Sequence, residues 1–181
     1  MRKFFAVVIL AATLLSLLAG CGTTVKTPET TAPPMSGVLH ENVLDNFEKI
    51  VAESELADFY EVTRLPATKL TEADETHQTI VVTDAILGIN SYHVSVRSNA
   101  AGHVYMTEIT SSNYDDMALS LFCSYLVEAM GLDVGIVELG DNLGLLETAP
   151  SGEMSVGEWK LSTLTVSDLV TFWARYAPEA T

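Results

Sequence analysis

The sequence predicts an α+β domain with two layers, in which an antiparallel β-meander packs against helices. Three observations predict this class: an amphipathic helical pattern comes first, three strand-like segments follow in a run, and a second apolar helical pattern comes after them. A doubly wound fold is excluded because the strands do not alternate with helices. We expect one domain over residues 38–181, preceded by a signal peptide (1–20) and a tether (21–37).

The first half of the domain is expected to form one helix and three strands. Apolar residues recur with a period near 3.6 over residues 39–60, which predicts an amphipathic helix. The polar run 71–79 is expected to be a loop. Alternating segments then predict strands over 80–87, 91–97 and 103–110, separated by short segments that contain Gly88 and Gly102.

The second half is expected to begin with a helix that covers the meander. Asn113 and Asp116 resemble a capping box and Gly131 supplies a stop; one face of this helix carries Leu119, Phe122, Cys123, Leu126 and Met130. Further elements are expected as a hairpin of 134–139 and 143–147, a strand over 159–164, and a last helix that starts at Thr165 or Ser167 and ends before Pro178.

The N-terminus has the parts of an export signal. Arg2 and Lys3 precede an apolar run from Phe4 to Leu18, which is shorter than the ~20 residues that a spanning helix needs. The segment Leu18-Ala19-Gly20-Cys21 then resembles the lipobox of bacterial lipoproteins. This resemblance covers residues 1–21 only. It implies cleavage before Cys21, a diacylglyceryl group on its thiol, further acylation such as palmitate, and attachment to the membrane through this lipid.

Residues 22–36 are rich in Thr and Pro and predict an extended tether. Pro28, Pro33 and Pro34 prevent a helix, so about 15 residues could hold the domain up to roughly 50 Å from the bilayer. Gly22 does not resemble the aspartate that retains lipoproteins in the Gram-negative inner membrane. We therefore expect the outer face of a cell membrane, with a Gram-negative outer membrane as the alternative.

Charge and cysteine content exclude several classes of protein. Nine Lys and Arg residues stand against 24 Asp and Glu residues, a net charge of -15; loss of Arg2 and Lys3 leaves seven against 24, or -17. Such a surface repels phosphates, so a nucleic-acid partner is excluded. With Cys21 acylated, Cys123 has no disulfide partner, and its apolar surroundings predict a core position.

No catalytic, nucleotide-binding or metal-binding motif is present in the sequence. The acidic clusters lack the alternating ligands and central glycine of a calcium loop, so they are interpreted as solvated surface; they are Glu53, Glu55, Asp58 and Glu61, and Glu72, Asp74 and Glu75. We expect no cofactor and no metal.

A candidate binding face is predicted on the hairpin of residues 91–110. A loop of residues 98–102 would place Arg97 opposite His103 and Ser95 opposite Tyr105, and would turn Glu108 toward the core. The face would then carry His93, Arg97, His103 and Tyr105. His93 and His103 would lie roughly 13 Å apart, too far to share a zinc ion.

Two classes of function are left open by the sequence. The preferred one is a lipoprotein of the cell envelope whose domain binds an envelope protein or a small ligand without catalysis. The alternative is an envelope hydrolase that uses His93 or His103, with Ser95 or Ser111 as a candidate nucleophile.

Overall fold

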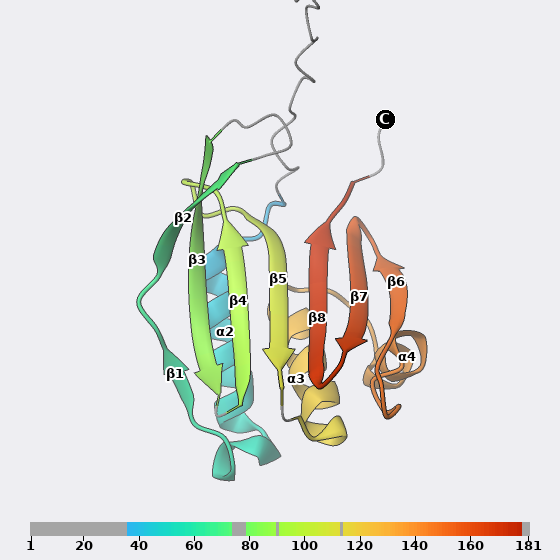
Figure 1. Ribbon diagram of the computed structural model, residues 1–181. Coiled ribbons are helices and arrows are strands. Elements are labelled where there is room, and N and C mark those ends of the chain that lie inside the picture. Colours follow the sequence, from blue (N-terminus) through green and yellow to red (C-terminus); the bar gives the residue numbers. More distant parts are fainter. Residues whose placement is uncertain (1–35, 74–78, 90, 113, 179–181) are drawn as a thin grey trace, which may run out of the picture.

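The protein is an antiparallel β-sheet with helices on one of its faces (Figure 1). The computed structural model describes residues 36–73, 79–89, 91–112 and 114–178. The signal peptide, Cys21 and nearly all of the tether lie outside these residues, as does Asn113. The elements in chain order are α2 (His40–Glu53), η1 (Glu55–Asp58), β1 (Val62–Arg64), β2 (Thr68–Ala73), β3 (Thr79–Ile89), β4 (Tyr92–Ser98), β5 (Val104–Ser111), α3 (Asp116–Ala129), α4 (Ile136–Leu143), β6 (Gly152–Val156), β7 (Trp159–Val166) and β8 (Leu169–Tyr176).

Eight strands form the sheet, in the order β1-β3-β4-β5-β8-β7-β6, with β2 also paired to β3. Every pairing is antiparallel. The expected meander is β3-β4-β5, and the second run β8-β7-β6 extends it from β5. The predicted α+β class is confirmed, because α2 and α3 pack against one face of this sheet.

The core lies between the helices and the sheet. Helix α2 contributes Val43 and Phe47, and α3 contributes Phe122, Cys123 and Leu126, all fully buried. The rings of Phe47 and Phe122 meet with centroids 6.4 Å apart, so the two helices share one cluster. The alternate residues of the strands close it from the other side: Val94 and Val96 in β4, and Val170, Phe172 and Ala174 in β8.

The first expected helix is shorter than predicted, because α2 ends at Glu53 and a 3-10 turn follows it. Ser54 causes the break. Its hydroxyl donates to the carbonyl of Val51 and accepts from the amide of Leu56, so it competes with the helical hydrogen bonds. The expected loop 71–79 is also wrong in part: β2 runs to Ala73 and pairs with β3, which begins at Thr79.

Helix α3 confirms the predicted apolar face, since Leu119, Phe122, Cys123, Leu126 and Met130 are all buried. The predicted capping box is wrong: the N-cap of α3 is Asp115 and not Asn113, and its carboxylate accepts from the amide of Ala118 at 2.9 Å. The expected stop is confirmed: the amide of Gly131 donates to the carbonyl of Glu128, with φ at +76°.

The expected hairpin of 134–139 and 143–147 is wrong, because helix α4 occupies this region. Leu139 and Leu143 are four residues apart and both are buried, which fits one helix face. Gly144 ends the helix in the left-handed conformation, with φ at +62°. β6 then begins at Gly152, where a side chain would collide with the backbone of Asn142 and Leu143.

The last expected helix is also wrong, because residues 169–176 form strand β8. Val170, Phe172 and Ala174 are buried while the residues between them are not, a period of two. The expected strand over 159–164 is confirmed as β7, which continues to Val166. A two-residue turn of Ser167 and Asp168 joins β7 to β8.

Candidate functional site

The four residues of the predicted binding face do not share one face in the structure. In β4 the predicted alternation holds, with Tyr92, Val94 and Val96 buried and His93 exposed. In β5 it is inverted, because the register shifts by a bulge between Arg97 and Ser98. Tyr105 is consequently only 6% exposed. The predicted pairing of Ser95 with Tyr105 is wrong, since Ser95 lies opposite Glu108.

Glu108 points away from the core and toward Arg97, contrary to the prediction. Arg97 lies opposite Met106, and its guanidinium Nη2 approaches the Oε2 atom of Glu108 at 3.8 Å. Both side chains are partly exposed, so this ion pair contributes little to stability. The two charges nevertheless share the outer surface of β4 and β5.

The two histidines of the hairpin, His93 and His103, lie in different environments. His93 is exposed on the outer surface of β4, whereas His103 precedes β5 and its Nδ1 atom lies 2.9 Å from the carbonyl oxygen of Ser36. Ser111, a candidate nucleophile for the hydrolase alternative, is buried at the end of β5. His93 therefore shares the outer face of β4 with Ser95 and Arg97, whereas Ser111 and Tyr105 are buried.

The sheet has an open face, which no helix of the described residues covers (Figure 1). Side chains on this face form rows that run across the strands. One row joins Arg97, Met106, Arg175 and Lys160 on β4, β5, β8 and β7. The next row places Glu108 opposite Trp173, and the far end of β7 and β8 adds Leu164, Val166 and Leu169.

The open face therefore has two parts with different chemistry. We call Leu164, Val166, Leu169 and Trp173 the apolar half; Trp173 is partly exposed, and the three aliphatic side chains are 45%, 61% and 45% exposed. We call Arg97, Arg175 and Lys160 the cation row. Sequence reasoning missed Trp173 and Arg175 because it predicted a helix for residues 165–177, although their alternation with buried residues was a visible signal.

A hollow of about 300 Å³ lies at the end of the sheet near the β7–β8 turn. Tyr114 lines it and donates to the carbonyl of Thr148 at 3.1 Å. The lining residues are Ser112, Tyr114, Thr148, Ala149, Thr165, Ser167 and Asp168. Hydroxyl groups and one carboxylate can form hydrogen bonds with a polar ligand, but this lining has no histidine to act as a base for a serine nucleophile.

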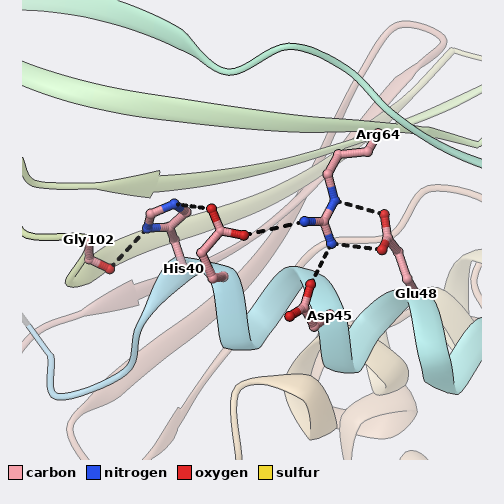
Figure 2. Close-up of polar contacts among 6 residues, drawn as sticks. His40, Asp45, Glu48, Arg64 and Gly102 are labelled. Carbon is pink, nitrogen blue, oxygen red and sulfur yellow. Dashed lines mark hydrogen bonds and ion pairs between the residues drawn. The ribbon is translucent and has the colours of Figure 1, made fainter.

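On the other face, a polar network ties β1 to the start of α2 (Figure 2). Arg64 donates to both carboxylate oxygens of Glu48, at 3.0 and 2.7 Å, and to Asp45 at 2.8 Å. These hydrogen bonds raise the pKa of Arg64. Glu41 accepts from Arg64 and also meets His40, whose other ring nitrogen lies 3.3 Å from the carbonyl of Gly102. The network is exposed and joins elements, so it has a structural role.

Cys123 has the properties of a core residue, as predicted. It is fully buried on α3, and burial raises the pKa of its thiol.

Within residues 36–178, leaving aside the gaps, no group of three His, Cys, Asp or Glu side chains could hold a metal ion. No helix of the described residues is long and apolar enough to span a membrane.

No family model, curated protein or solved structure matches this chain in the comparisons. Any function must therefore be argued from the residues and their arrangement.

Proposed function

We propose that this chain is a lipoprotein of the cell envelope, anchored through Cys21, whose domain binds an envelope protein without catalysing a reaction. The lipobox-like segment Leu18-Ala19-Gly20-Cys21 supports the anchor, and the location follows as the outer face of the membrane. The open face supports the binding role. A hydrolase is the weaker proposal: Ser111 is buried, and although Ser95 shares the outer face of β4 with His93, this face is an open sheet surface and the pocket near the β7–β8 turn contains neither residue.

One observation carries the binding proposal: the apolar half of the open face presents large apolar side chains to solvent. Trp173 lies at the middle of the sheet, and Leu164, Val166 and Leu169 extend the patch to the β7–β8 turn. A partly exposed Trp beside aliphatic side chains and an arginine is typical of the residues that dominate protein interfaces. The partner is accordingly a protein with an apolar surface of its own.

The anchor is tested by the variant Cys21→Ser in cells supplied with labelled palmitate. Cys21 is the thiol of the lipobox-like segment, so this variant is expected to stay unlabelled and uncleaved. Cys123→Ser is the matched control, because it makes the same change at a buried core position and should keep the label. Equal labelling of the Cys21→Ser variant and the unchanged chain would refute the anchor.

The binding face is tested by photo-crosslinking in the same cells. A photoreactive residue in place of Leu164 is expected to give a discrete crosslinked protein, and the further change Trp173→Ala should lower its yield at least about tenfold. A photoreactive residue at Lys49, exposed on α2, should not give this product. The same product from both positions, or an unchanged yield with Trp173→Ala, would rule out the apolar half as the interface.

A further inference from the structure

The cations of this acidic domain are not evenly distributed. Residues 36–178 contain six Lys and Arg residues, which are Lys49, Arg64, Lys69, Arg97, Lys160 and Arg175. Half of them form the cation row on the open face. Arg64 is bound by three carboxylates of α2, and Arg97 pairs with Glu108 and lies opposite Asp84 in the register. Lys160 and Arg175 are therefore the part of the cation row that stands out on this strongly acidic protein.

Lys160 and Arg175 face each other on adjacent strands and are both exposed. Like charges placed directly opposite each other in a sheet are destabilising. Among the described residues, neither forms an ion pair with a carboxylate. Glu158, a nearby acidic residue, instead accepts a hydrogen bond from Tyr176 at 2.7 Å. A neighbouring anionic surface would offset the repulsion between the two cations.

The cation row lies at the end of the sheet where the chain enters the domain. The amide of Ser36 donates to the carbonyl of Val104 at 3.1 Å, and the amide of Val104 donates to Val38 at 2.9 Å. Val104 pairs with Ser98, next to Arg97 in β4. Fourteen residues separate Ser36 from Cys21, so a lipid on Cys21 would keep this end within roughly 50 Å of the bilayer.

We infer that the cation row contacts the anionic phospholipid headgroups of the membrane and thereby orients the domain on the bilayer. This inference rests on the proposed anchor at Cys21. Arginine and lysine near a negatively charged bilayer are attracted to it, whereas charges farther than about 8 Å are largely screened at physiological salt. The acidic surface of α2, which includes Asp45 and Glu48, lies on the opposite face of the sheet. The β7–β8 turn and much of the apolar half then point away from the membrane, open to a protein partner.

The test uses the mature lipidated chain, purified in mild detergent and reconstituted into vesicles. Because Cys21 is acylated and Cys123 is buried, a cysteine introduced at Ser155, beside Lys160, can carry a fluorophore alone. Quenching by a headgroup-attached quencher should be several-fold greater in vesicles with about 30% phosphatidylglycerol than in pure phosphatidylcholine. A label at Ser112, at the opposite end of β5, should show no such difference.

Two matched variants decide whether the cation row is responsible. Lys160→Glu should abolish the dependence on phosphatidylglycerol, while Lys49→Glu, the same change on α2, should preserve it. Equal quenching in the two kinds of vesicle would overturn the inference, as would equal effects of the two variants. If mass spectrometry showed no acyl chains on the mature protein, the anchor at Cys21 would be refuted, and the orientation that depends on it would be refuted as well. Intact acylation without dependence on phosphatidylglycerol would refute the orientation alone.

Discussion

Tyr92 in β4 contacts the start of α3 through its hydroxyl group and packs against other aromatic side chains through its ring. The hydroxyl donates to the carbonyl of Asp115 at 3.3 Å and accepts from the amide of Asp115 at 2.9 Å. The ring lies edge-on to Tyr60 and Phe122, with centroids 6.0 and 5.0 Å away. Burial raises the pKa of Tyr92 to about 12, because the phenolate would lose its hydration.

This raised pKa predicts a loss of stability at alkaline pH. The folded protein holds the proton of Tyr92 more tightly than the unfolded chain, whose tyrosine has a pKa near 10. The contribution is complete below pH 10 and is lost as pH rises toward about 12, at a cost of about 1–2 kcal/mol. Urea unfolding of Tyr92→Phe should show a smaller decrease over this range. Tyr125→Phe is the control, and equal pH slopes for wild type and Tyr92→Phe would contradict the assignment.

Single residues at the β4–β5 turn explain why the candidate site was predicted only in part. The side chain of Asn99 accepts from the amides of Ala101 and His103, and the turn it forms leads into the bulge. One extra residue in a strand moves every later side chain to the other face. The sequence therefore placed His93 and Arg97 correctly on the outside, but not Tyr105 or Glu108.

Among the elements, the two long helices were predicted because α2 and α3 have fourteen residues each, enough for the apolar period to repeat over several turns. Strands β3, β4, β5 and β7 were predicted because turn residues separate strand-like segments. Helix α4 has only eight residues, about two turns, and its polar Asp141-Asn142 favoured a turn in the sequence. β8 was mistaken for a helix because Ser167, a good N-cap residue, lies where a tight hairpin turn occurs.

The β7–β8 turn offers a direct test of this interpretation. Ser167 adopts φ of +57°, a left-handed conformation that costs a non-glycine residue about 1 kcal/mol. Ser167→Gly is therefore expected to increase the free energy of unfolding by up to about 1 kcal/mol in urea titrations. Asp168→Gly, one residue along the same turn at a position without positive φ, should not stabilise the protein. Stabilisation by both changes, or by neither, would contradict the turn geometry.

In the whole molecule, one face of the sheet is buried beneath the helices and the other is exposed to solvent. A single cluster of buried side chains joins α2, α3 and α4 to strands from both halves of the sheet. The two tryptophans report on the two sides: Trp159 belongs to the buried cluster and is 4% exposed, whereas Trp173 lies on the open face. Because the cluster is continuous, we expect the domain to unfold as one unit.

The variants Trp173→Phe and Trp159→Phe separate these two signals. Trp173→Phe keeps Trp159 as the only tryptophan, and acrylamide should quench its fluorescence weakly in the folded protein. Trp159→Phe keeps Trp173, whose fluorescence should be quenched strongly. In urea, the fluorescence midpoint of each variant should coincide with its own far-ultraviolet circular dichroism midpoint, since one core holds both faces of the sheet. A change in Trp173 fluorescence that precedes the loss of secondary structure would mean that the β8–β7–β6 half opens separately. Equal quenching of the two tryptophans would mean that the open face is covered, which would remove the basis for a binding surface there.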